Sequence, residues 1–118
     1  MSTEQTKQTM DRYFTLMGSE GDFARCYAAD VTWLVADTGE IVRGPQTVRN
    51  YVVTLHARLT DMQTLNFVVA DDHSYLEGDC SAGRSRADER IHYCVAYDID
   101  GGLITAMRCY GLGAPPTP

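Results

Sequence analysis

A histidine and a cysteine, two residues apart in the last third of the chain, have side chains suited to proton transfer. His92 and Cys94 fall within residues 90–98, whose composition is typical of a strand, so both side chains project from the same face. A histidine in an apolar pocket is neutral near pH 7, because desolvation disfavours its charged form. Such a base could take a proton from a carbon next to a carbonyl group. The alternative is that His92 faces the outside of a sheet or a dimer partner.

A carboxylate stands at the end of an earlier strand-like segment, residues 31–36. Alternation places Trp33, Val35 and Asp37 on one face of the chain here. A tryptophan and a carboxylate on the same face either line a cavity or close one end of a core. Asp37 also begins the turn 37–39, since Asp and Gly are typical turn residues. Both interpretations of Asp37 stay open from the sequence.

The four cysteines indicate neither a metal site nor a dense set of disulfides. None belongs to a C-x-x-C pair, and each lies in an apolar or strand-like stretch, which is typical of buried free thiols. A nucleophilic thiol at Cys94 needs a neighbouring base, and the α-carbon of His92 lies roughly 6.5–7 Å away along a strand, which is long for a direct pair. We therefore expect no covalent step at this thiol, no metal site and no cofactor.

Length, charge and hydropathy limit the kind of protein. A chain of 118 residues corresponds to one domain, which we expect to span residues 1–111, followed by a flexible tail at 112–118. The net charge of −6 argues against nucleic acid and anionic membranes as partners, since both bind basic surfaces. No apolar signal segment or membrane-length apolar run is present in the sequence. We therefore expect a cytoplasmic location.

Hydrophobic periodicity predicts helices mainly in the first half of the chain and strands mainly in the second. A helix capped at Ser2 or Thr3 is followed by a short helix that Asp22 caps, and Gly44-Pro45 begins a third helix. Strands are predicted at residues 31–36, 40–43, 64–70, 75–81, 90–98 and 103–110. Helices on one side of consecutive antiparallel strands indicate an α+β fold, in which a curled sheet could leave a pocket under the helices.

Several pieces of the chain together resemble a known superfamily. They are DRYFTLM, GDF, YAADVTW, the turn followed by GP and an amphipathic helix, and YDIDGG-ITAMRCY. Over residues 8–111 they resemble the nuclear transport factor 2-like superfamily, whose small bacterial members include ketosteroid isomerases and SnoaL-type polyketide cyclases. The resemblance implies a cone-shaped α+β fold with a curved mixed or antiparallel sheet around about three helices, a deep apolar pocket and a dimer. The same fold hosts many activities, so it does not settle the chemistry.

The resemblance to ketosteroid isomerases carries over to one of their three catalytic positions. Those enzymes use an Asp base and an oxyanion hole formed by a Tyr and a protonated Asp. Tyr13 matches the Tyr of the first helix. Val35 falls at the position of the base, with Asp37 two residues further along the same face, and Cys94 falls at the position of the protonated Asp. The resemblance therefore argues against steroid isomerisation.

The sequence as a whole predicts a pocket for a small hydrophobic molecule that contains a carbonyl group. We expect cofactor-free chemistry of the isomerase, cyclase or dehydratase type, with Asp37 and His92 moving a proton and Tyr13 holding the oxygen. The alternative is a non-catalytic ligand-binding or dimerisation module of the same fold, and we expect a homodimer. The predicted pocket wall consists of Met17, Trp33, Val35, Tyr51, Leu55, Cys94, Met107 and Cys109.

Overall fold

The computed structural model describes residues 2–82 and 90–112. Its helical elements are α1 (Thr3–Gly18), the 3-10 turn η1 (Phe23–Cys26) and α2 (Pro45–Ala57). Its strands are β1 (Tyr27–Val35), β2 (Glu40–Arg43), β3 (Leu59–Val69), β4 (His73–Ala82), β5 (Ile91–Asp100) and β6 (Leu103–Tyr110). Most of the segment between the strands predicted at 75–81 and 90–98, and nearly all of the predicted tail, lie outside the described residues.

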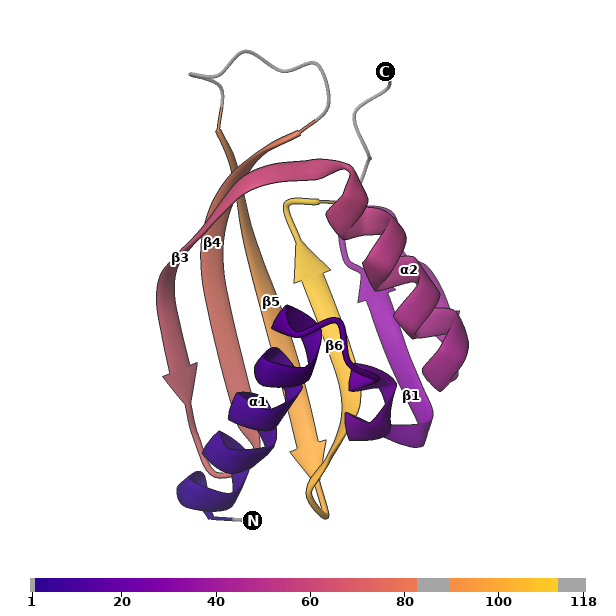
Figure 1. Ribbon diagram of the computed structural model, residues 1–118, viewed down its shortest axis with the longest axis vertical. Coiled ribbons are helices and arrows are strands. Elements are labelled where there is room, and N and C mark those ends of the chain that lie inside the picture. Colours follow the sequence, from indigo (N-terminus) through magenta and orange to yellow (C-terminus); the bar gives the residue numbers. More distant parts are fainter. Residues whose placement is uncertain (1, 83–89, 113–118) are drawn as a thin grey trace.

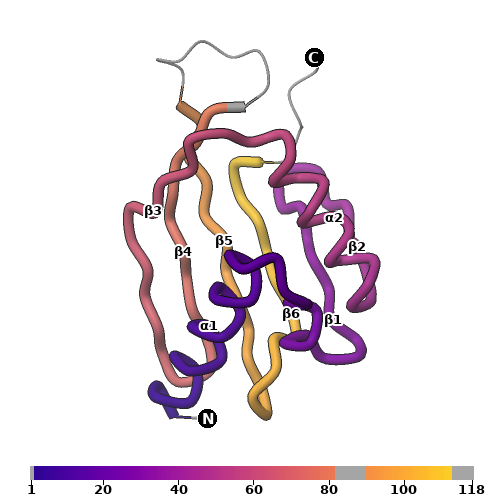
Figure 2. The backbone as a smooth tube through the Cα atoms, viewed as in Figure 1, coloured from indigo at the N-terminus to yellow at the C-terminus, as the bar shows by residue number. Residues whose placement is uncertain are grey.

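The strands form a single curved, open sheet in the order β2-β1-β6-β5-β4-β3. The neighbours β1 and β6 are parallel, and the other neighbouring strands are antiparallel. β6 therefore connects the β1–β2 hairpin to the meander of β3, β4 and β5. Figures 1 and 2 show α1, η1 and α2 together on the concave side of this sheet. The predicted α+β fold with a curved mixed sheet is confirmed.

Local sequence signals explain where the helices begin. Ser2 forms a capping box with Gln5, in which each side chain bonds the other residue's backbone N–H. Gly44 adopts a φ of 91°, which favours glycine, and Pro45 then occupies the first helical position of α2. The second predicted helix is only one 3-10 turn, because Asp22 makes no capping hydrogen bond and the chain enters β1 at Tyr27.

The core fills the space between the two helices and the concave face of the sheet. Alternation along β1 turns Val31, Trp33 and Val35 inward, where each is at most 4% exposed. From the helix side, α1 contributes Tyr13 and α2 contributes Val52 to the same cluster. Burying a side chain of this size contributes roughly 1.5–3 kcal/mol, so the inward positions hold the helices against the sheet.

Three strands begin earlier than the sequence patterns predict. β1 begins at Tyr27 rather than residue 31, β3 begins at Leu59 rather than residue 64, and β4 begins at His73. At the start of β4, Nδ1 of His73 lies 2.9 Å from the Asp98 carboxylate on β5. In β1 and β3 the pairing register shifts part-way along the strand, and such bulges break the alternation from which strands are predicted.

Candidate functional site

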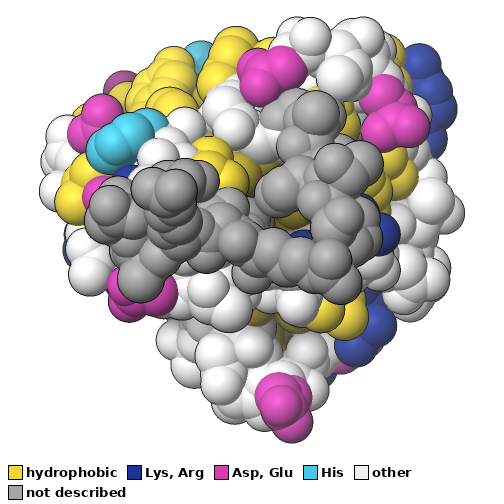
Figure 3. All heavy atoms as spheres, turned by 90° about the horizontal axis from the view of Figure 1, so that it is seen from above, with side chains coloured by type: hydrophobic (Ala, Val, Ile, Leu, Met, Phe, Trp, Pro, Cys, Tyr) yellow, Lys and Arg dark blue, Asp and Glu magenta, His cyan; other side chains and the backbone are white. Residues whose placement is uncertain are grey.

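A cavity of about 170 Å³ lies between α1, α2 and the concave face of the sheet. Its walls come from both helices and from β1, β3, β4 and β5. The start of β3, which borders the cavity, is at the end of the molecule uppermost in Figure 1. Figure 3 shows this end from above, where hydrophobic side chains are visible among polar ones.

Aromatic rings make up much of the cavity wall. Tyr13 and Phe14 on α1 both contact Tyr97 on β5, with ring centroids 6.1 Å apart in each pair and edge-to-face geometry. Trp33 enters from β1 and packs against Tyr51 of α2 at 5.8 Å. Such tilted and edge-to-face contacts are the preferred arrangements of aromatic rings, so these walls are rigidly packed.

Two phenol groups meet between α1 and the start of β1. The Tyr13 hydroxyl lies 2.7 Å from the Tyr27 hydroxyl, and the two share a hydrogen bond. Burial raises the pKa of Tyr13 well above its usual range, and the charge that Tyr27 would carry raises it further. Tyr13 therefore stays protonated at ordinary pH and can act only as a hydroxyl donor or acceptor.

One polar atom of a wall residue has no partner. Nε1 of Trp33 is buried and has no hydrogen-bond acceptor among the described residues. Buried polar groups in proteins are nearly always paired, so this indole N–H is an exception.

His56 brings an imidazole group to the cavity lining. It follows Leu55 near the end of α2 and is half-buried, between the cavity and a shallower hollow beside the end of α1. Desolvation by burial lowers the pKa of His56 from 6.5. Its imidazole is therefore neutral at pH 7, and among the described residues of the lining no Asp, Glu, Lys or Arg is present.

The predicted pocket wall divides into residues that line the cavity and residues that lie elsewhere. Three of them line the cavity: Met17, Trp33 and Leu55. Three more are buried in the core and are not among the described lining residues: Val35, Met107 and Cys109. Burial raises the pKa of the Cys109 thiol to about 12, so this thiol is inert. Tyr51 is half-buried behind Trp33.

Asp37 does not reach the cavity. It lies in the exposed turn between β1 and β2, two residues after Val35, the last inward-facing residue of β1. Its two carboxylate oxygens accept the backbone N–H of Gly111, at 3.2 and 3.3 Å. Among the two interpretations of the sequence, the structure shows Asp37 as a turn residue that ties β1 to the end of β6.

His92 and Cys94 lie on the opposite face of the sheet from the cavity. Along β5 it is Tyr93, Val95 and Tyr97 that point into the cavity, so their neighbours point outward. His92 is exposed, and Cys94 is partly covered on the outer face. The structure therefore brings Tyr13 and His56 to the cavity, and leaves Asp37, His92 and Cys94 outside it.

Sequence patterns contained a signal for His56. It lies four residues after Val52 on the apolar stripe of α2, and residues four apart share one face of a helix. Tyr93 and Tyr97 could also have been found, because the alternating set with Val95 is the more apolar face of β5. Nothing in the sequence alone pointed to the unpaired Trp33 Nε1.

A family model describing the SnoaL-like domain matches residues 11–107 of the 118. The chain belongs to the SnoaL-like domain family. No curated protein matches it.

Solved structures resemble the SnoaL-like domain over nearly its whole length. A putative ketosteroid isomerase from Kribbella flavida is 20% identical, with a TM-score of 0.71, over 98% of this chain and 83% of that one. A steroid delta-isomerase from Pseudomonas aeruginosa is 14% identical, with a TM-score of 0.76, over 89% and 77%. An NTF2-like protein from Burkholderia xenovorans is 16% identical, with a TM-score of 0.71, over 93% and 91%. At these identities the likeness shows the fold alone.

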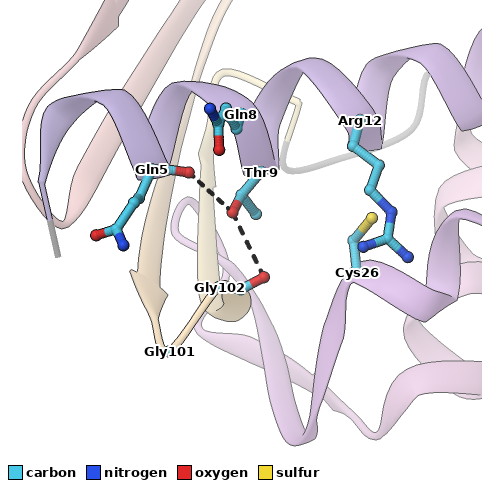
Figure 4. Close-up of a pocket in the computed structure, with 7 residues that line it drawn as sticks. All are labelled: Gln5, Gln8, Thr9, Arg12, Cys26, Gly101 and Gly102. Atoms are coloured by element: carbon cyan, nitrogen blue, oxygen red, sulfur yellow. Dashed lines mark hydrogen bonds between the residues drawn. The ribbon is translucent and has the colours of Figure 1, made fainter.

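The SnoaL-like domain also has a larger, polar groove, of about 600 Å³, between α1 and the turn that joins β5 to β6. Figure 4 shows Arg12 and Cys26 side by side at one end, and Thr9 bonded to the carbonyls of Gln5 and Gly102 at the other. Burial raises the pKa of the Cys26 thiol, and the nearby Arg12 only partly offsets this. Among the described residues that line the groove, there is therefore neither an activated nucleophile nor a base.

Metal binding and membrane insertion find no support in the described residues. Within residues 2–82 and 90–112, no three His, Cys, Asp or Glu side chains are grouped so that they could hold a metal ion. None of the helices in these ranges has the length and apolar character needed to cross a membrane.

Proposed function

We propose that this SnoaL-like domain binds a small, neutral carbonyl compound in the apolar cavity and moves a proton on it, with His56 as the base. The fold and family support small-molecule binding or isomerase-type activity in general. Proton transfer goes beyond this general support. The sequence alone predicted the same chemistry with Asp37 and His92, and we now assign the base to His56. No cofactor is required for such a step.

The observation that carries the proposal is the position of His56. Its imidazole is half-buried at an otherwise apolar and aromatic cavity, and burial lowers its pKa. A neutral imidazole accepts a proton near pH 7, whereas the cavity tyrosines Tyr13 and Tyr97 have pKa values raised far above neutrality by burial. Among the described lining residues, His56 is thus the one suited to act as a general base.

The proposed step is an enolisation. His56 takes a proton from the carbon next to the carbonyl, the C–H electron pair forms a carbon–carbon double bond, and the carbonyl oxygen gains negative charge. Tyr13 holds that oxygen with its hydroxyl, which the bond from Tyr27 helps to orient. Return of the proton from His56 to another carbon completes an isomerisation, and return to the same carbon gives exchange with solvent.

The experiment measures exchange of carbonyl-adjacent protons with D₂O by NMR, over ketones from butanone to a four-ring ketosteroid. We expect at least one ketone to exchange in the presence of the protein. His56→Gln should lower that rate by about 100-fold or more, which is the usual contribution of a general base. Tyr13→Phe should lower it by a similar factor, as loss of an oxyanion donor does.

Two variants serve as matched controls. Asp37→Asn and His92→Gln change the bases predicted from sequence, and both residues lie outside the cavity. We expect both variants to keep the exchange rate of the wild type. Loss of exchange in either variant, with His56→Gln unaffected, would overturn our assignment and restore the assignment made from sequence.

The second candidate is a binding module without catalysis. It is favoured by the lack of any carboxylate among the described lining residues, since a carboxylate is the base in ketosteroid isomerases. Saturable binding of a ketone, with no exchange above the background rate, would select this alternative.

A further inference from the structure

The polar groove between α1 and the β5–β6 turn is large enough to hold a small organic molecule. Its volume of about 600 Å³ lies within the 300–1,000 Å³ of typical small-molecule sites. Its walls carry amide, hydroxyl and guanidinium groups and glycine backbone, from Gln5, Gln8, Thr9, Arg12, Gly101 and Gly102. The groove therefore suits a polar ligand, in contrast to the apolar cavity.

The two sides of the groove are held in place without a ligand. The Thr9 hydroxyl on α1 lies 3.1 Å from the carbonyl oxygen of Gln5 and 3.4 Å from that of Gly102 in the turn (Figure 4). Gly101 and Gly102 adopt φ values of 59° and 82°, and a Cβ added at either would meet no atom within 4 Å. The turn is thus fixed against α1 and leaves open space beside its backbone.

Arg12 supplies a positive charge at one end of the groove. Its side chain is exposed, and Figure 4 shows it extending from α1 to Cys26. Among the described residues, no carboxylate lies within ion-pair distance of this guanidinium group, whereas Lys7 on the same helix pairs with Asp11. A guanidinium group that is accessible in this way can bind two oxygens of an anion at once.

A second arginine adds to the positive potential at this end. Burial raises the pKa of the Cys26 thiol, and the charges of Arg12 and Arg25 act to lower it. Asp22 acts in the opposite direction, so the described charges that act on this thiol are two cations and one anion. The Cys26 end of the groove is therefore locally positive, on a chain whose net charge is −6.

We infer that the groove binds a hydroxylated organic anion, a sugar phosphate or a sugar acid, with its anionic group on Arg12 and its hydroxyl groups beside Gln5 and Gln8. The Gln8 amide can both donate and accept hydrogen bonds, as a hydroxyl group requires. The amide oxygen of Gln5 caps α1, which leaves its NH₂ group as a donor. The described lining offers neither an activated nucleophile nor a base, so this is a site for binding, and it goes beyond the proposed function.

The test is an NMR titration of the whole chain at low ionic strength with glucose, glucuronate, glucose 6-phosphate and inorganic phosphate. The three sugars share one ring and differ at one end. We expect the resonances of the Gly101 and Gly102 backbone amides and of the Gln8 side chain to move. One anionic sugar at least should bind about fivefold or more tightly than glucose, as a partly exposed ion pair allows. The tighter of the two distinguishes a phosphate from a carboxylate ligand, and inorganic phosphate should bind more weakly than that sugar.

Arg12→Gln keeps a hydrogen-bonding side chain but removes the charge, so the affinity for the anionic sugar should fall to that for glucose. Arg43→Gln is the matched control, because it removes the same charge from an exposed position on β2, outside the described lining of the groove. We expect this control to bind as the wild type does. Equal loss in both variants, equal binding of glucose and the anionic sugars, or binding of none of them overturns the inference. Inorganic phosphate that binds as tightly as the sugars overturns it as well.

The inference and the proposed function can fail separately. Proton exchange depends on a ketone at His56, whereas the titration depends on Arg12, which is not among the described lining residues of the apolar cavity. Exchange of ketone protons without sugar binding would keep proton transfer and reject the anion site. Sugar binding through Arg12 without ketone exchange would keep the anion site and reject proton transfer by His56.

Discussion

The hydroxyl groups of Tyr13 and Tyr27 are hydrogen-bonded in the core, and breaking this bond should lower the stability of the fold. Replacing Tyr13 by Phe leaves the Tyr27 hydroxyl without its partner at 2.7 Å. We expect Tyr13→Phe to lower the free energy of unfolding by about 1–3 kcal/mol, measured by urea denaturation. The double variant with Tyr27→Phe should recover part of this loss, because it removes both buried polar groups. An additive loss in the double variant would contradict the hydrogen bond.

His56 gives the protein a pH dependence of defined sign. Its folded-state pKa lies below the 6.5 of an exposed histidine, so the unfolded chain binds the proton more tightly. Above that pH both states are neutral and His56 contributes nothing. As the pH falls through 6.5, protonation favours the unfolded state and stability decreases. Between about pH 7.5 and pH 5, His56→Gln should therefore lose less unfolding free energy than the wild type. Equal losses would show that His56 is not desolvated.

Gly78 on β4 leaves room for the side chain of Tyr93, which lines the cavity. A Cβ atom there would come within 2.7 Å of both the Tyr93 hydroxyl and the backbone oxygen of Gln63. Gly78→Ala should cost about 1–3 kcal/mol of stability, since overpacking displaces neighbours that include backbone. Gly18→Ala is the matched control, because nothing lies within 4 Å of its added Cβ. A neutral Gly78→Ala would show that Tyr93 does not pack there.

At the scale of elements, the helices and most strands could be predicted because each has a regular period. The starts of β1 and β3 could not, since bulges interrupt their alternation. In β3 the shift falls between Thr60 and Gln63, where Asp61 adopts a φ of 51°. A residue with positive φ interrupts regular strand pairing. The sequence at the start of β3 therefore lacks the alternation that predicts a strand.

The candidate site was harder to predict because it depends on which face of β5 is turned inward. Moving by one residue along a strand exchanges its two faces, so a small error in alignment to the family sends His92 inward in place of Tyr93. The burial of Tyr93, Val95 and Tyr97 decides the face. Predicting His56 as a cavity residue required knowing how α2 is rotated against the sheet. Helical periodicity locates the apolar face of α2 only approximately.

At the scale of the whole molecule, the convex face of the sheet is not covered by the helices and carries exposed apolar side chains. Val68 and Tyr75 are paired neighbours on β3 and β4, and they are 47% and 42% exposed. Ile41 on β2 and Tyr110 on β6 are exposed as well. Exposed apolar side chains that lie next to each other, as Val68 and Tyr75 do, are characteristic of contact sites.

We expect this convex face to bind a second copy of the chain, which gives the predicted homodimer a surface. Tyr75→Asp should weaken dimerisation at least about tenfold, measured by sedimentation across a concentration series, because two copies of the charge meet in a symmetric interface. Val53→Asp is the control, since Val53 is exposed to 46% on α2, away from this face. A monomeric wild type, or equal weakening by both variants, would contradict the assignment.

The position of β6 between β1 and β5 has a consequence for synthesis in the cell. In the sheet formed by the described residues, β6 joins the β1–β2 hairpin to the β3–β4–β5 meander, and the β6 partners of β1 follow it by about 75 positions in the sequence. Neither part can enclose the hydrophobic core until residues 103–110 have left the ribosome. The nascent chain therefore carries β1 with one of its two edges unpaired until β6 has been made, a period in which chaperones are most needed.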